Sequence, residues 1–277
     1  MAQVESGPMQ TTANLWEVLC NDLETQRHQP TGEKHRVAAQ KFKEAAQQVF
    51  RKGSPRLSDA LEIAGDVCQA AGFFSDAVQD FKDSLSHNLE NGNITAAARV
   101  AGKLALLSEH QGEEATARRY YSQSMELYEA AHDFSQHCML ASNLAGLEKH
   151  AGNFPACERH YLQALETAVR LHGEVHPEVA LVCNNLAVAY TESGDWVRAE
   201  NLHMRALGIR EQVFGAMHPE VAQSLANLAV VYHSSSNFKK ARSYYEAALK
   251  TYLAFKKPDA PELASIQANL EKIRDRD

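Results

Sequence analysis

The sequence lacks the features by which a chain of its size enters or crosses a membrane. No run of about eighteen apolar residues occurs anywhere along it, which excludes a membrane-spanning helix. Residues 1–12 contain neither the basic region nor the apolar core of a secretory signal. We therefore expect a cytoplasmic protein that makes no membrane contact, with residues 1–12 forming a disordered N-terminus.

Basic residues are in short supply. The 28 lysines and arginines are outnumbered by 35 aspartates and glutamates, which gives a net charge of −7. Proteins that bind nucleic acid by neutralising phosphates usually carry a basic excess or a basic stripe. The sequence has neither, so we expect no nucleic-acid partner.

Cysteines are few and widely separated. The five are Cys20, Cys68, Cys138, Cys157 and Cys183, an odd number without a CxxC pair. This spacing indicates neither a disulfide framework nor a zinc site. We expect the cysteines to be small buried residues of a protein from a reducing compartment.

Catalytic motifs are absent as well. The sequence has no Walker loop, GxGxxG, GxSxG or HExxH motif, so we expect no enzyme and no cofactor. Thirteen histidines raise the question of a metal site, and His172 lies four residues before His176. Gly173 and Pro177 place this pair at a turn, however, so we expect no metal there. His176 and His218, each followed by proline, are expected instead to begin helices.

The chain does contain an internal repeat. The sequence HPEVA at residues 176–180 recurs at residues 218–222, a spacing of 42 residues. The same spacing relates four asparagines, each followed by leucine: Asn143, Asn185, Asn227 and Asn269. Upstream the spacing shortens to 40 residues between Gly72, Gly112 and Gly152. A repeat of this length indicates a stack of helical hairpins, and the change from 40 to 42 predicts two additional residues in a loop.

Each repeat reads as helix, turn and helix. In residues 177–214, apolar residues recur at the i, i+3, i+4 and i+7 positions of one helical face, at Cys183, Leu186, Ala187 and Tyr190. Gly194 then supplies a helix end, and Asp195 a cap for the second helix. The alanines allow two helices to approach closely beside an aromatic side chain. Such a hairpin cannot bury both faces alone, so several must stack.

The pattern predicts five repeats within residues 58–255. Their expected ranges are 58–91, 98–131, 138–171, 180–213 and 222–255. Residues 13–52 are expected to form an N-terminal helical pair, in which Ala38, Phe42 and Ala45 indicate a possible sixth, degenerate repeat. Residues 256–277 are expected to contain a C-terminal capping helix at 264–274, with its charged side toward solvent.

These residues resemble the tetratricopeptide repeat (TPR) family. The second-helix pattern of small, aromatic and small residues stands here as Ala241, Tyr245 and Ala248, and the segments HPEVA, NNLAVAY and LANLAVVY are similar to kinesin light chain repeats. The resemblance implies an all-α, right-handed superhelical solenoid of helix-turn-helix repeats. Kinesin light chains also carry a coiled coil ahead of their repeats. Residues 1–12 leave no room for one before the first expected helix, so we expect the repeat module and not a motor subunit.

The resemblance also implies where a ligand would bind. In TPR proteins the first helix of each repeat lines a concave groove, so we expect a peptide to contact its exposed face. The candidate groove residues are Asn143, Asn185, Asn227, Arg99, Lys103, Lys149, Leu181, Val188 and Val230. The asparagine amides can donate hydrogen bonds to a peptide backbone and accept hydrogen bonds from it. The basic residues would attract an acidic peptide. Alternatively, the asparagines serve packing between repeats.

Two functions follow from this pattern. The first is a non-catalytic adaptor or scaffold that binds an extended or helical peptide of a partner protein in the groove. The alternative is a structural subunit that assembles into a homo-oligomer through its convex or terminal surfaces, with Trp16, Phe73, Phe74 and residues 253–263 as candidates. The sequence does not identify the partner.

Overall fold

The protein is all helical in the parts that the structure describes. The computed structural model describes residues 32–50, 54–255, 261–274 and 276; within them lie twelve helices and no strand. The helices are α2 (Gly32–Val49), α3 (Pro55–Ala70), α4 (Phe74–Glu90), α5 (Ile94–His110), α6 (Glu114–Ala130), α7 (Phe134–His150), α8 (Phe154–His172), α9 (Pro177–Ser193), α10 (Trp196–Phe214), α11 (Pro219–Ser234), α12 (Phe238–Leu253) and α13 (Pro261–Lys272). The predicted all-α repeat solenoid is confirmed. None of these helices is long and apolar enough to span a bilayer.

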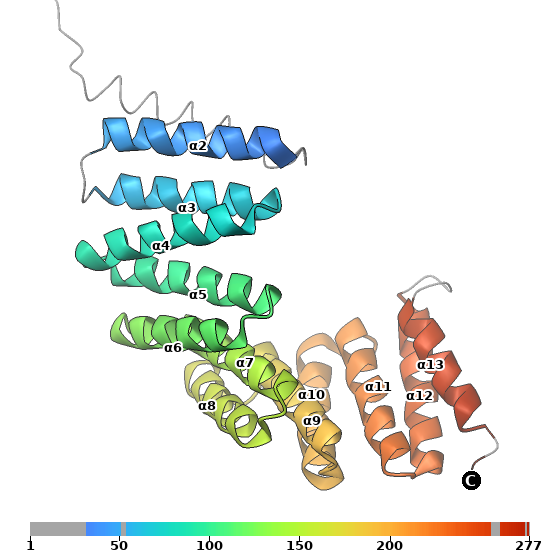
Figure 1. Ribbon diagram of the computed structural model, residues 1–277. Coiled ribbons are helices and arrows are strands. Elements are labelled where there is room, and N and C mark those ends of the chain that lie inside the picture. Colours follow the sequence, from blue (N-terminus) through green and yellow to red (C-terminus); the bar gives the residue numbers. More distant parts are fainter. Residues whose placement is uncertain (1–31, 51–53, 256–260, 275, 277) are drawn as a thin grey trace, which may run out of the picture. The chain divides into compact units, whose positions relative to one another are not determined.

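The helices form five hairpins, divided between two compact units. The N-terminal unit, Met1–Asp133, contains α2 and the hairpins α3–α4 and α5–α6, which lie side by side in chain order (Figure 1). The C-terminal unit, Phe134–Asp277, contains the hairpins α7–α8, α9–α10 and α11–α12, followed by α13 against α12. Each hairpin therefore has a neighbouring hairpin within its own unit, as stacked repeats require.

The turn inside each hairpin depends on a left-handed residue. Gly72, Gly112, Gly152 and Gly194 adopt φ angles between 73° and 83°. In the last hairpin Ser236 takes this position with a φ of 61°. A left-handed residue at the end of a helix lets the following amide bond back to the last turn, as Asp195 N does to Tyr190 O at 2.9 Å.

The two additional residues of the longer repeat lengthen a helix, so their predicted place in a loop was wrong. The second helices α8 and α10 contain 19 residues each, whereas α4 and α6 contain 17. After Pro155 in its first turn, α8 contains no glycine or proline before Gly173, so the helix continues through His172. The longer second helix brings its last turn close to the start of the next repeat.

The core of each hairpin pairs a small residue with a large ring. The small position of the first helix is Gly65, Ala105, Ala145, Ala187 and Ala229 in the five hairpins, and all five residues are buried. The ring position of the second helix is Phe81, Tyr121, Tyr161, His203 and Tyr245, also buried. In the first hairpin the two helices approach closely, since a Cβ on Gly65 would lie 2.6 Å from Cε1 of Phe81.

Four of the five cysteines are buried free thiols, as predicted; Cys20 lies outside the described residues. Burial raises the pKa of Cys68, Cys138 and Cys157 to about 11. These three thiols therefore stay protonated and unreactive at neutral pH.

The ends of the described chain differ in detail from the prediction. Phe42 is buried in α2, but the small buried residues beside it are Ala39 and Ala46; the predicted Ala38 and Ala45 are half-buried. The expected first helix of the 13–52 pair and the expected disorder of residues 1–12 lie outside the described residues. At the other end α13 begins at Pro261, three residues before its expected start, and buries Leu263 and Ile266.

Candidate binding surface on the first helices

The first helices of the C-terminal unit leave one stripe of side chains at the surface. On α9 this stripe contains Leu181, Asn185 and Val188, while the intervening positions are buried in the hairpin core. We define the first-helix stripe as these three residues together with the side chains at the matching positions of α7 and α11: Met139, Asn143, Gln223, Asn227 and Val230. The sixth matching position is Gly146, which has no side chain. All eight are exposed or half-buried.

The apolar members of the stripe are open to solvent. Leu181 is 50% exposed, Met139 47% and Val230 38%. A leucine or methionine buried against a partner gains about 1.5–3 kcal/mol relative to the exposed side chain. Aligned apolar side chains separated by amides are therefore suited to contact with an amphipathic peptide.

One asparagine of the stripe, Asn227, is hydrogen-bonded to the preceding repeat. Nδ2 of Asn227 donates to Oδ1 of Asn184 at 2.7 Å, linking α11 to α9. Asn184 in turn is 3.5 Å from Oδ1 of its neighbour Asn185. The sequence left open whether the asparagines serve packing between repeats. Asn227 does so, and the acceptor of its hydrogen bond is a side chain. An amide has two donor hydrogens and an acceptor oxygen, so Asn227 keeps capacity for a ligand.

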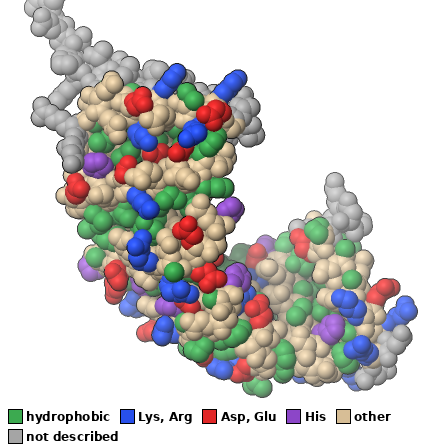
Figure 2. Space-filling view, in the orientation of Figure 1, with side chains coloured by type: hydrophobic (Ala, Val, Ile, Leu, Met, Phe, Trp, Pro, Cys, Tyr) green, Lys and Arg blue, Asp and Glu red, His purple; other side chains and the backbone are tan. Residues whose placement is uncertain are grey.

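The two basic candidates of the N-terminal unit are held by acidic residues of the preceding repeat. Arg99 on α5 makes two hydrogen bonds to Glu62 on α3, of 2.9 and 2.7 Å. Lys103 lies 2.7 Å from Glu62 and 2.7 Å from Asp66. Acidic and basic side chains lie close together over this unit on the face shown in Figure 2. Because Arg99 and Lys103 are paired with carboxylates, their attraction for an acidic peptide is weakened.

Lys149 is also engaged. Its Nζ lies 3.0 Å from Oε1 of Glu192, which connects α7 to α9 in the C-terminal unit. All three basic candidates thus bridge successive first helices.

The carboxylate of Glu62 depends on its two cationic neighbours. Burial by itself would raise the pKa of Glu62, but the hydrogen bonds from Arg99 and Lys103 hold this pKa below the ordinary glutamate value. The interactions of Glu62 with its two cationic neighbours therefore contribute stability at neutral pH. This contribution is lost as the pH falls below the ordinary glutamate range.

Replacing Glu62 with glutamine should lower the free energy of unfolding by about 1–2 kcal/mol, because both cations lose a charged acceptor. Urea unfolding at neutral pH measures the change. Glu90→Gln, an exposed substitution on α4, serves as the control and should change stability little. Equal stability of the two variants would show that the Glu62 cluster contributes nothing.

The histidines before the two prolines begin helices, as predicted. Nδ1 of His176 accepts a hydrogen bond from the backbone N–H of Glu178 at 3.2 Å, and His218 does the same for Glu220 at 3.2 Å. Each imidazole therefore caps the first turn of its helix, and the proline that follows needs no hydrogen-bond donor.

A second feature of the C-terminal unit was missed in the sequence. Tyr190 on α9 donates its hydroxyl to Glu158 on α8 at 2.6 Å, and Arg198 lies 4.2 Å above the tyrosine ring while contacting the same carboxylate. These residues help to line a pocket of about 570 Å³. The set recurs 42 residues later as Tyr232, Glu200 and Lys240, with the lysine 4.6 Å from the tyrosine ring. The sequence contained a signal for this feature, which is the recurrence of a tyrosine, an acidic residue and a basic residue at the repeat spacing of 42.

Comparison with known proteins supports the repeat. Residues 136–212 and 182–254 match the family model for the tetratricopeptide repeat. The sequence matches none of the curated proteins with which it was compared.

The crystal structures similar to this chain include the following three. BtubC (BKLC) from P. vanneervenii is 27% identical, with a TM-score of 0.67, over 82% of this chain and 94% of that chain. The nearly identical TPR-like repeats of a putative kinesin light chain from Podosopora anserina are 15% identical, with a TM-score of 0.62, over 74% and 99%. NprR in complex with its cognate peptide NprX is 14% identical, with a TM-score of 0.52, over 94% and 74%. The last two likenesses concern the fold alone.

Proposed function

Because the chain is a tetratricopeptide repeat protein with kinesin light chain-like repeats, we propose that it is a non-catalytic adaptor. It binds an extended or helical peptide of a partner protein along the first-helix stripe of the C-terminal unit. The observation that carries this proposal is the exposure of Leu181, Met139 and Val230 beside half-buried asparagines. Apolar anchors would supply affinity, and the amides would hold the peptide backbone.

The charges on the first helices favour a ligand that is not strongly acidic. Arg99, Lys103 and Lys149 are each within 3.0 Å of a carboxylate, so an acidic ligand would have to compete with Glu62, Asp66 or Glu192. The stripe itself offers amide and aliphatic groups. A peptide with apolar side chains at helical or alternating spacing suits it best.

The likeness of fold to NprR adds limited support. NprR was crystallised with its cognate peptide NprX, so a helical-repeat chain of this kind can hold a peptide. A cytoplasmic location, with a protein or peptide partner, is part of the same proposal.

A pair of matched variants tests the adaptor proposal. Peptides that bind the full chain would be selected from a displayed library of random peptides, and their affinity measured by fluorescence polarisation. Leu181→Glu places a charge in the stripe, and Val197→Glu places the same charge on α10, where Val197 is 72% exposed. Because both side chains are exposed, both variants should keep the melting temperature of the wild type.

We expect Leu181→Glu to weaken peptide binding at least about tenfold, since an apolar anchor contributes on the order of 1.4 kcal/mol or more. Val197→Glu should leave the affinity unchanged. Equal affinities of the two variants would place the selected peptides elsewhere and contradict the proposal.

A structural subunit is the second candidate function. At the end of α12, Leu253 and Phe255 are 51% and 52% exposed, which favours a terminal contact. Phe73 and Phe74 are less suited, because Phe73 lies beneath Arg36 and Phe74 packs on His110. Trp16 lies outside the described residues. Light scattering that gives a discrete oligomer for wild type, and a monomer for Phe255→Glu, would favour this function.

A further inference from the structure

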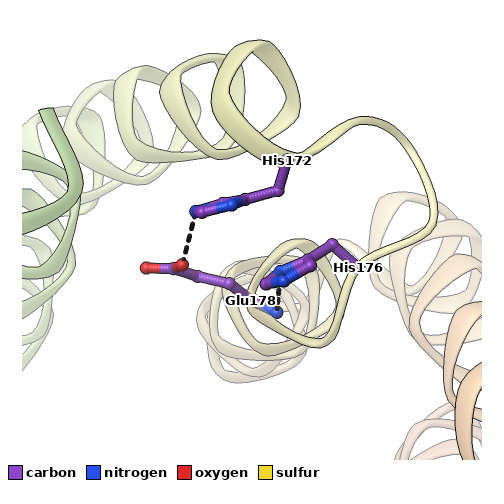
Figure 3. A group of neighbouring side chains, drawn as sticks. All are labelled: His172, His176 and Glu178. Atoms are coloured by element: carbon purple, nitrogen blue, oxygen red, sulfur yellow. Dashed lines mark hydrogen bonds and ion pairs between the residues drawn. The ribbon is translucent and has the colours of Figure 1, made fainter.

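Three side chains with metal-binding groups converge where α8 meets α9. His172 is the last residue of α8, His176 caps α9, and Glu178 lies in the first turn of α9. One ligand atom of each residue lies within 4.8 Å of those of the other two (Figure 3). The two imidazoles stack with centroids 4.2 Å apart, and Nε2 of His172 is 2.9 Å from Oε2 of Glu178.

The next repeat provides an internal comparison for this cluster. Phe214 occupies the position of His172 and stacks on His218 with a centroid distance of 4.5 Å and the same interplanar angle of 14°. A phenyl ring therefore satisfies the packing of this turn, and the imidazole at residue 172 is not needed for it. The histidine adds what phenylalanine lacks, which is a ring nitrogen that contacts Glu178 and can serve as a metal ligand.

The acidic residue of the cluster also differs between the two repeats. Glu220 is paired with Arg210, whose guanidinium lies 2.9 Å from its carboxylate. The residue 42 positions before Arg210 is Ala168, so Glu178 has no arginine at the matching place and is paired with His172 instead. The connection between α8 and α9 thus combines two imidazoles and a carboxylate. The connection between α10 and α11 combines an imidazole, a phenyl ring and an arginine-bound carboxylate.

We propose that His172, His176 and Glu178 form a binding site for a divalent transition-metal ion, for which zinc is the best fit. Imidazole nitrogens and a carboxylate oxygen are preferred ligands of Zn²⁺. The two imidazoles now stack nearly parallel, so coordination requires their rings to rotate until the nitrogen lone pairs point at one ion. The fourth tetrahedral position stays open for water. A bound ion would fasten the last turn of α8 to the first turn of α9 and so fix the connection between two repeats.

Binding requires existing contacts to be released: the imidazoles leave their stacked arrangement, the contact of His172 with Glu178 gives way to the ion, and the cap of α9 is lost. Nδ1 of His176 now accepts the cap hydrogen bond from Glu178 N. A metal on Nδ1 replaces this bond, and a metal on Nε2 places a proton on Nδ1, so the cap is lost either way. Loss of a cap lowers the affinity by roughly fivefold, which leaves measurable binding for a site with three ligands.

Zinc titration of the full chain tests the site. The protein, free of any histidine tag, is stripped with a chelator and titrated with Zn²⁺ in competition with a chromophoric indicator. Two variants remove ligands: His172→Phe reproduces the residue of the next repeat, and His176→Asn keeps a side chain that can cap a helix. His218→Asn is the matched control, with the same change at the equivalent turn. Melting temperatures in chelator show whether all four proteins are equally folded.

We expect the wild type to bind one Zn²⁺ tightly at this cluster, and each ligand variant to weaken binding at least about tenfold. His218→Asn should bind as the wild type does. Substitution with Co²⁺ should give the visible absorption of a nitrogen- and oxygen-ligated ion in wild type and not in His172→Phe. The proposal is overturned if the wild type binds no zinc, if His172→Phe binds as tightly as wild type, or if His218→Asn weakens binding as much as His176→Asn.

Discussion

Replacing Phe81 with alanine is expected to lower the free energy of unfolding by about 3–5 kcal/mol, the range for large rings removed from a core. Phe81 is completely buried, and its ring packs directly on Gly65. Because glycine has no side chain, Gly65 itself cannot fill the space that the ring leaves. Chemical denaturation followed by circular dichroism measures the change. Phe255→Ala, at a ring that is 52% exposed, should change stability little.

A double-mutant cycle tests the contact itself. In wild type, Gly65→Ala gains helix propensity but places a Cβ 2.6 Å from the Phe81 ring, which forces the core to shift. In the Phe81→Ala background the same substitution enters empty space and should stabilise the protein by about 1 kcal/mol. The effect of Gly65→Ala must therefore be more favourable when Phe81 is absent. An identical effect in both backgrounds would show that the two residues are not coupled.

Acid should destabilise the C-terminal unit through His203, and His203→Phe should remove this sensitivity. His203 takes the ring position of its hairpin and is 1% exposed, and its Nδ1 has no hydrogen-bond partner in the described part of the chain. Burial, with a smaller effect of the neighbouring Arg210, lowers the pKa of His203 to about 4. The folded protein therefore holds this imidazole neutral.

The direction of the pH effect follows from the lowered pKa. Between the ordinary histidine pKa of about 6.5 and the folded value of about 4, the unfolded chain binds a proton that the folded chain does not. Stability from this residue is complete above about pH 6.5, falls as the pH is lowered, and is lost by about pH 4, a total on the order of 3 kcal/mol.

The measurement is the difference in unfolding free energy between His203→Phe and wild type across this pH range. Carboxylate titrations common to both proteins cancel in the difference. We expect a small difference at neutral pH that grows in favour of the variant toward pH 4. A difference that stays constant with pH would contradict the neutral, buried state of His203.

The repeat itself was predictable because identical residues recur at fixed spacing. Asn185 and Asn227, or the histidines at 176 and 218, mark equivalent positions without any structural information. The helix starts at the two histidines also followed from local chemistry, since each precedes a proline and an acidic residue. That their imidazoles accept the capping hydrogen bonds was shown by the structure.

The ion pairs of the first helices could not be predicted in this way. Arg99 was expected to face a ligand, but its partner Glu62 lies 37 residues earlier on the neighbouring helix. Which residues of two stacked helices oppose each other depends on their axial register, and the repeat spacing alone does not give it. Likewise Asn184, next to the predicted Asn185, is the residue that accepts the bond from Asn227.

The proposal that a partner peptide lies along the first-helix stripe is tested most directly by site-specific crosslinking. A photoreactive amino acid replaces Leu181 on α9, Val230 on α11 or Val197 on α10, and each protein is irradiated with a peptide selected on the wild type. We predict crosslinks from positions 181 and 230 and none from 197. Crosslinking from 197, with none from the two stripe positions, would contradict the proposed binding surface.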